Sequence, residues 1–459
     1  MDVGCRGIAL LLCSVVWSGP LQAQDTTAAA PPKPPPESAT PAVTVVPGTI
    51  DLTGAEARES PASKVTGTKP LRFTLGHEAS FRTQEERGIV NNRSWFRLEY
   101  SSLVHDDFFV QLDSKLNSYW RSDHRAKAEG KSVVLETSTP EAFVQYSGAG
   151  GSTSVKAGVQ RLIWGESEAG AVTDEVSPRN LSELFFIPLE EARIGQFMVN
   201  VEHFSPAGNW NLFYVPAPKF NKYPKPGTAY FADPFDGRAN VRDAFSKHRH
   251  ETGLRWKRTF SRSDVSLMAA SLIDNDHVYR LDNVDPGGRL DVSRTTQRFT
   301  LLGTTFNYAT GRLLAKGEVG WKHRKAFNDA ALQVLKKDVI DASLGLTYSL
   351  GQSNTVGVEV VNSHLRDWSD RIVGVPRNTT SLVLNANLFF LNDQLSVNLL
   401  AIAVRPFKSY QSSIRTSYKW SDNLTFSVDA HLIHVPDPQS RLYRYRGQDQ
   451  IVFRVQHQF

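Results

Sequence analysis

Charged side chains gather in two neighbouring segments whose chemistry suits the handling of ions. The first, residues 164–195, carries seven carboxylates: Glu166, Glu168, Asp174, Glu175, Glu183, Glu190 and Glu191. The second, residues 217–247, carries six basic side chains: Lys219, Lys222, Lys225, Arg238, Arg242 and Lys247. Opposed charges across a narrow, partly desolvated passage interact more strongly than exposed pairs, so they can orient a passing solute. Alternatively, both segments are solvated loops with ordinary charges.

Catalysis and metal binding find little support in the sequence. His431 and His434 flank no convincing nucleophile, and His248 and His250 alternate within one predicted strand, so none is expected to act as a general base. The aspartates between residues 274 and 291 are spaced unlike any defined calcium loop. We therefore expect a protein that is not an enzyme, with no catalytic residue, no metal site and no cofactor.

The start of the acidic segment carries a more particular pattern. Residues 158–166 read Gly-Val-Gln-Arg-Leu-Ile-Trp-Gly-Glu, and residues 177–180 read Ser-Pro-Arg-Asn. Gly165 permits a tight turn off a strand, and Pro178 restricts the loop, so a purely structural turn is one interpretation. The pattern also resembles an uncharacterised family of proteobacterial outer-membrane proteins of unknown function, whose last element is closer to Asn-Pro-x-Asp. This resemblance implies an outer-membrane location and no known substrate.

The last strand, residues 451–459, indicates the kind of element that must position these groups. Its residues alternate with a period of two. One face carries Ile451, Phe453, Val455, His457 and Phe459, and the other carries Val452, Arg454, Gln456 and Gln458. A closing strand that ends on a C-terminal Phe in a secreted chain resembles the assembly signal of bacterial outer-membrane β-barrels. We therefore interpret Phe459 as part of such a signal.

The same alternation recurs from Leu71 onward. In the segment 106–120, for example, apolar residues occupy one face and charged residues the other. Short links between the segments alternate with long connections, as a barrel with short periplasmic turns and long outer loops requires. We therefore predict an all-β fold, a transmembrane antiparallel β-barrel over residues 71–459 with about 18 strands (about 16–18).

An aromatic residue recurs at the end of each strand that is predicted to run toward a short turn. The residues are Tyr100, Tyr146, Phe204, Phe260, Tyr308, Tyr348, Phe390, Trp420 and Phe459. Amphipathic rings prefer the headgroup level of a bilayer, so the recurrence predicts a periplasmic girdle. A general preference of aromatic residues for strand ends would explain only some of these positions.

The segment before Leu71 is predicted to lie outside the barrel wall. An apolar run at residues 8–17 is too short to span a bilayer as a helix and precedes Leu-Gln-Ala, so we predict a signal peptide over residues 1–23. It contains both cysteines, which leaves the mature chain without a thiolate. Residues 24–70 are Pro-rich and predict a disordered periplasmic linker, with a hatch inside the barrel as the alternative.

Composition narrows the class of protein further. The chain has 459 residues, of which 40% are hydrophobic and 22% charged, so it is neither disordered nor a helical membrane protein. The net charge of +5 and the export signal argue against nucleic-acid binding. The expected partners are outer-membrane lipids and lipopolysaccharide, the barrel-assembly machinery and small solutes. A homo-oligomer and a monomer both remain open.

The position of segment 164–195 as the predicted third outer loop indicates a function. In general porins this loop folds inward and narrows a water-filled lumen, and segment 164–195 resembles it in order and length. The resemblance implies a channel for small hydrophilic solutes, and the predicted lumen charges lean basic, which favours anions weakly. The pore-constriction candidates are Glu166, Glu168, Asp174, Glu175, Arg255, Lys257 and Arg415. The alternative is a dedicated conduit or receptor of an export or lipid and hydrophobic-compound system, favoured by the apolar run 184–189.

Deleting Phe459 tests the predicted assembly signal. The truncated protein is expected to accumulate as periplasmic aggregates and degradation products, because a barrel that is not recognised cannot insert. The measurement is the heat-modifiable band of folded barrel in membrane fractions. Normal insertion without Phe459 would contradict this interpretation of the last strand.

Overall fold

The computed structural model describes residues 70–459, apart from residues 85–86, 149, 168–169, 188–190, 246–248, 439 and 441. The predicted signal peptide, and the predicted linker up to residue 69, lie outside the described residues. Within the described part of the chain, no helix is long and apolar enough to cross a membrane.

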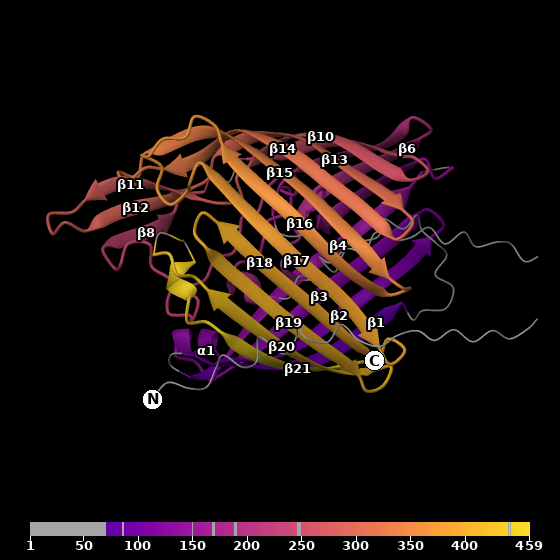
Figure 1. Ribbon diagram of the computed structural model, residues 1–459, viewed down its shortest axis with the longest axis horizontal. Coiled ribbons are helices and arrows are strands. Elements are labelled where there is room, and N and C mark those ends of the chain that lie inside the picture. The colour runs from indigo at the N-terminus through magenta and orange to yellow at the C-terminus, as the bar shows by residue number, and fades with distance from the viewer. Residues whose placement is uncertain are drawn as a thin grey trace, which may run out of the picture. The chain divides into compact units, whose positions relative to one another are not determined.

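Eighteen antiparallel strands form one sheet (Figure 1). They are β1 (Leu71–Arg82), β2 (Gly88–His105), β3 (Phe108–Trp120), β4 (Val133–Ser147), β5 (Thr153–Gln160), β6 (Gln196–Ser205), β7 (Gly208–Val215), β9 (Glu251–Thr259), β10 (Ser263–Ile273), β13 (Arg298–Thr310), β14 (Leu313–Asn328), β15 (Val334–Leu350), β16 (Asn354–Leu365), β17 (Asn378–Phe390), β18 (Leu395–Arg405), β19 (Ser409–Lys419), β20 (Leu424–His434) and β21 (Gln450–Gln458). β1 pairs with β2 on one side and with β21 on the other, so the sheet closes on itself. The predicted fold class, an all-β antiparallel barrel, is confirmed.

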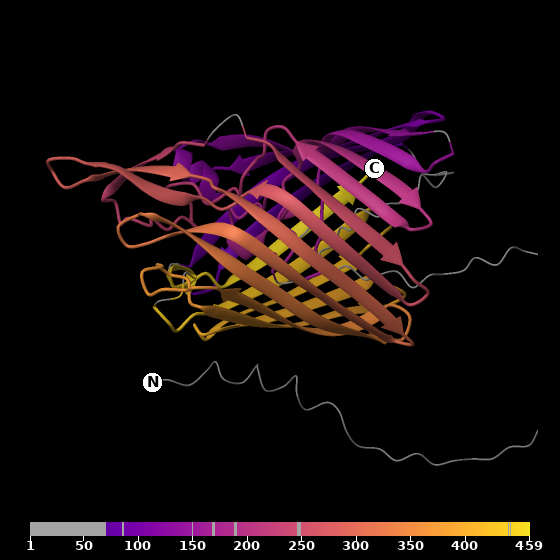
Figure 2. The ribbon, with the colours of Figure 1, turned by 90° about the horizontal axis from the view of Figure 1, so that it is seen from above.

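Three short strands form a second sheet outside the barrel wall: β8 (Ala239–Asp243), β11 (Val278–Val284) and β12 (Leu290–Thr295). Figures 1 and 2 show this sheet projecting from one end of the barrel. The sequence alone predicts loops here, because β8 pairs in parallel with β12 of a different loop and leaves no local signal. The helix α1 (His124–Glu129) has six residues, too few to reveal a helical period.

The barrel wall is apolar outside and polar inside. On β15, Leu344 and Leu346 are 57% and 43% exposed, whereas Asp341 and Thr347 are each 7% exposed. A water-soluble protein has the opposite arrangement. The exposed apolar band is therefore the lipid-facing surface of an outer-membrane barrel.

The aromatic residues predicted as a girdle lie at the strand ends that meet the short turns. All have exposed side chains except Tyr100, which is half-buried. At the end of the chain, the Phe459 backbone N–H donates to the Phe73 carbonyl at 2.9 Å, while the Phe459 ring stays exposed. This placement suits rings at the headgroup level of a bilayer.

One sector of the inner wall departs from the polar pattern. β6, β7, β10 and β13 carry apolar residues on their inner faces as well, including Met198, Phe213, Leu272 and Leu301, each fully buried. Water in a lumen would leave such side chains unfavourably hydrated. Another part of the chain must therefore pack against this sector.

Substitutions of two adjacent residues of β18 test whether the wall has a lipid-facing and a water-facing side. Leu399 points outward and Asn398 lines an internal cavity. Leu399→Arg places a charge in the lipid and is expected to lower the free energy of unfolding by about 2–4 kcal/mol. Asn398→Arg adds the same side chain where water can solvate it, so its cost is expected to be smaller. Urea titration of protein refolded into bilayers measures both, and equal losses would contradict the facing pattern.

Candidate functional site

Loop L3, residues 161–195 between β5 and β6, lies inside the barrel against the apolar sector. Trp164 is 1% exposed and packs edge-on against Phe213, with 5.1 Å between ring centroids. Its indole N–H donates to Asn211 Oδ1 at 3.2 Å. The buried cluster also contains Leu162, Val176, Met198, Val215, Met268, Ala270, Leu272, Phe299 and Leu301. Each large apolar side chain buried in this way contributes about 1.5–3 kcal/mol, so these contacts hold Leu162, Trp164 and Val176 against the wall.

Polar contacts join the same segment to β14. Glu318 of β14 accepts from the Ser167 backbone N–H at 2.6 Å and from the Thr173 hydroxyl at 2.5 Å. Lys322 lies four residues further along β14, on the same face of the strand, and pairs with Glu175 at 2.5 Å. Burial alone would raise the pKa of Glu175, but the nearby lysines of β14 lower it below its ordinary value. Glu175 is therefore an ionised anchor of L3.

The later part of L3 reaches the opposite wall through Glu183. β2 and β14 lie on opposite sides of the ring of strands. The fully buried Glu183 carboxylate pairs with Arg93 of β2 at 2.6 Å and with Arg125 of α1 at 2.9 Å. Burial alone would raise the pKa of Glu183, but these two guanidinium groups hold it well below its ordinary value. L3 therefore crosses the lumen and joins a buried ion-pair network at Glu183 before it returns to β6.

The same network joins the first and last strands of the barrel. Arg93 also pairs with Glu78 of β1 at 2.6 Å, and Glu78 pairs with Arg454 of β21 at 2.5 Å. Arg454 pairs in turn with Asp429 of β20. These side chains are buried or nearly so, and removing any one of them would leave an uncompensated charge.

Two outer loops and β20 pack against this part of L3. The short helix η1 (Leu184–Phe186) places Phe186 against Tyr230 of loop L4 (residues 216–250) and His431 of β20, each at 5.3 Å between ring centroids. Loop L9, residues 435–449, contributes Leu442, Tyr443 and Tyr445 to the same cluster. The described part of the apolar run 184–189 is thus half-buried or buried among neighbouring loops.

A cavity of about 720 Å³ lies between the later part of L3 and the wall formed by β1–β4 and β18–β21. Ten basic residues line it: Arg72, Arg93, Arg97, Lys115, Arg125, Arg193, Lys219, Lys222, Arg415 and Arg454. Six acidic residues line it: Glu78, Glu99, Glu136, Glu183, Glu191 and Asp422. The lining is polar and carries an excess of positive charge.

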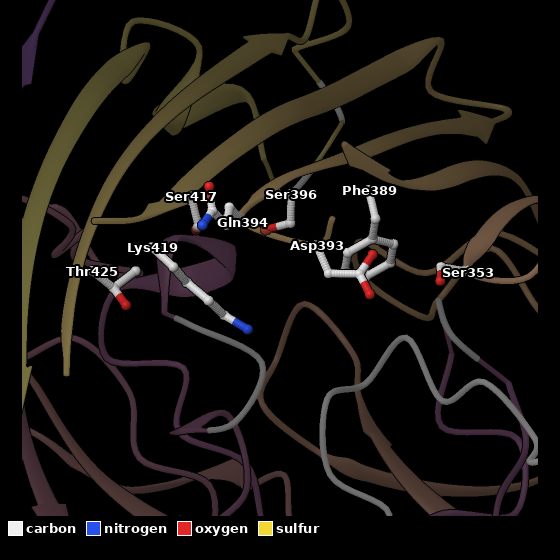
Figure 3. A pocket seen from close by; sticks show the side chains of 8 residues that line it. All are labelled: Ser353, Phe389, Asp393, Gln394, Ser396, Ser417, Lys419 and Thr425. Atoms are coloured by element: carbon white, nitrogen blue, oxygen red, sulfur yellow. The ribbon is translucent and has the colours of Figure 1, made fainter. Parts of the chain in front are cut away.

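A second cavity of about 310 Å³ lies beside the short turns β15–β16, β17–β18 and β19–β20. Figure 3 shows its lining, with Lys419 and Asp393 among the side chains that surround the space. Ser417 and Thr425 line both cavities. The two cavities therefore adjoin along the inner wall.

The constriction residues expected from the sequence occupy different places. Glu166 lies near Lys257, Lys316 and Arg255, which lower its pKa, but burial is the largest influence and raises the pKa above its ordinary value. Glu168 lies outside the described residues.

The remaining candidates form other ion pairs. Asp174 pairs with Arg193, another residue of L3, and Glu175 pairs with Lys322 as described above. Arg415 pairs with Asp429 at 3.0 Å. Among the candidates that the structure describes, Arg415 alone lines the larger cavity. The carboxylates of L3 that line it are Glu183 and Glu191.

The sequence pattern did not single out Arg93 or Arg125 as partners of L3. The two-residue alternation of charged side chains along β2 is a signal that could have revealed Arg93. Arg125 carries no such signal, because it belongs to a short helix outside the wall.

The closed ring, the lipid-facing apolar band and the polar cavity beside L3 define an outer-membrane β-barrel of the porin-like class. The chain belongs to the family described as "Protein of unknown function (DUF1302)", whose model matches residues 91–452. This match confirms the resemblance to an uncharacterised family and extends it over most of the barrel. A search of curated protein sequences finds no match.

Solved structures resemble the chain in fold. OccK8 (OprE) of Pseudomonas aeruginosa has a TM-score of 0.51 at 10% identity, covering 85% of this chain and 98% of that one. OccAB2 of Acinetobacter baumannii has a TM-score of 0.49 at 10% identity, covering 85% and 97%. The anion-selective porin from Comamonas acidovorans has a TM-score of 0.41 at 10% identity, covering 85% and 98%. At such low identity the likeness concerns the fold alone.

Glu183→Gln tests whether the ion-pair network keeps L3 across the lumen. Breaking a buried pair by removing one partner costs about 3–5 kcal/mol, so the loop end is expected to detach and the single-channel conductance to rise and become noisier. Glu99→Gln is the matched control, because Glu99 also lines the cavity but pairs with Arg72 of the wall at 2.5 Å. Equal conductance of the two variants in planar bilayers would show that Glu183 does not anchor L3.

Proposed function

We propose that the protein is a porin-like channel that passes small hydrophilic solutes across the outer membrane with a weak preference for anions. The observation that carries this proposal is the polar cavity beside L3, which ten basic and six acidic residues line. A lining of this kind suits hydrated ions and polar solutes, since apolar solutes would gain little from it.

The charge of the lining supports the direction and the weakness of the preference. Excess positive charge in a narrow cleft raises the local concentration of anions. Nine of the ten basic residues, however, pair with a carboxylate: Arg72, Arg93, Arg97, Lys115, Arg125, Arg193, Lys222, Arg415 and Arg454. Pairing reduces the field that a solute meets, so selectivity is modest rather than strict.

We propose further that the protein is not an enzyme. Among the described residues that line the larger cavity there is no histidine, and five of its six carboxylates, Glu78, Glu99, Glu136, Glu183 and Glu191, are engaged in ion pairs. Nucleophilic catalysis needs a nucleophile with a base within hydrogen-bonding reach. The proposed partners are small solutes within the barrel, outer-membrane lipids and lipopolysaccharide around it, and the machinery that inserts it.

The alternative conduit for lipids or hydrophobic compounds would use the apolar run 184–189. Phe186, at its centre, is 2% exposed because Tyr230 and His431 cover it. This burial gives the run a packing role and favours the hydrophilic channel.

Reversal potentials in planar bilayers under a KCl gradient test the proposal. The wild-type protein is expected to conduct steadily, with a potential displaced toward that of chloride. Lys219→Gln removes a positive charge from the cavity lining and is expected to shift the potential toward that of potassium. Lys131→Gln removes the same charge from an exposed site outside the lining and should leave the potential unchanged. A barrel without current would contradict the channel and favour a conduit or receptor.

A further inference from the structure

We propose that the inner wall holds a binding site for planar aromatic carboxylates, formed by Trp95 and the cations around it. The proposal rests on the channel function above and names a class of solute for it. The site lies on β1–β3, within the larger cavity, and faces L3.

Trp95 supplies an aromatic surface that lies against the wall. It is paired in register with Gly76 of β1, and both residues lie on the inner face of the barrel. A Cβ at Gly76 would lie 2.1 Å from Trp95 Cζ2 and 2.3 Å from Cε2, so the indole extends directly over the glycine. Glycine within a strand marks such a close approach. The wall thus supports one face of the ring, and the other face is turned toward the passage.

Cations surround this aromatic surface. The Lys115 ammonium of β3 lies 4.7 Å from the Trp95 ring centroid, and both residues line the cavity. Arg93 and Arg97 flank Trp95 on the same face of β2, and both line the cavity. A π face beside several cations suits a ligand that combines an aromatic ring with a negative charge.

The ion pair between Glu191 of L3 and Lys115 shows how a carboxylate binds at this site. The Glu191 Oε1 lies 2.5 Å from the Lys115 Nζ, and the Glu191 side chain is 40% exposed, against 10% for Lys115. A solute carboxylate can replace that of Glu191 on Lys115, since one charge-assisted contact is exchanged for another. The solute's ring would then lie on the indole, with Ile187 and Ile194 of L3 as apolar neighbours in the same cavity.

The geometry favours a flat aromatic acid over an aliphatic acid of similar size. A planar ring makes an offset-stacked contact with indole, which a puckered ring cannot reproduce. Benzoate and cyclohexanecarboxylate are therefore the matched probes, because they share charge and ring size and differ in planarity and π character.

Equilibrium binding and current block test the site on the full-length protein. Isothermal titration calorimetry gives the affinity for each probe without requiring conductance, and block of chloride current in planar bilayers gives its effect in the passage. The wild-type protein is expected to bind benzoate more tightly than cyclohexanecarboxylate. Trp95→Leu is expected to reduce this preference about fivefold, which corresponds to about 1 kcal/mol of stacking. Glu191→Gln is expected to tighten benzoate binding, because the competing carboxylate is gone.

Two further variants distinguish loss of the proposed site from a general effect of substitution in the wall. Gly76→Ala retains the indole but forces it off the wall, so it should reduce the preference as Trp95→Leu does. Phe109→Leu removes an aromatic residue from the inner face of β3 outside the cavity lining, and should retain the wild-type preference.

Equal affinity of the wild-type protein for the two probes, or an unchanged preference in Trp95→Leu, would overturn the proposed site. Benzoate binding without any current would instead contradict the channel function and leave the binding site standing. The two proposals therefore fail on different measurements.

Discussion

A ring of eighteen strands is too wide for its own side chains to fill, and the rest of the structure follows from that constraint. Water or another part of the chain must occupy the space. L3 occupies much of it, with Trp164 fully buried on one side of the lumen and Glu183 on the other. The polar cavities are the volume that L3 leaves beside the wall, so the placement of this one loop determines where a solute can pass.

The parts of L3 around Trp164 and around Glu183 are held by different physical interactions. Leu162, Trp164 and Val176 pack by apolar contact on β6, β7, β10 and β13, whereas Glu183 joins Arg93 and Arg125 through buried ion pairs. Apolar contact is non-directional and excludes water, but a charged network requires specific partners and borders a polar space. The larger cavity consequently lies on the ionic side, where charged side chains such as Arg97 and Lys115 line it.

The sequence predicts the barrel well because strand periodicity is local. Outward residues such as Leu344 and inward ones such as Asp429 follow directly from alternation, and so do the aromatic strand ends. The contacts of L3 are long-range, so the sequence pattern did not show that Glu175 pairs with Lys322 or that Arg125 meets Glu183. One overlooked signal was present: strands with apolar residues on both faces, such as β10, imply a cover inside the barrel.

The ion pair between Glu78 and Arg454 spans the junction of β1 and β21 from the inside. Arg93 links that pair to Glu183, so the network is complete only once the C-terminal strand has met the N-terminal one. Closure of the wall and docking of L3 are therefore thermodynamically coupled events. A barrel whose seam is still open lacks one side of the binding network for its own loop.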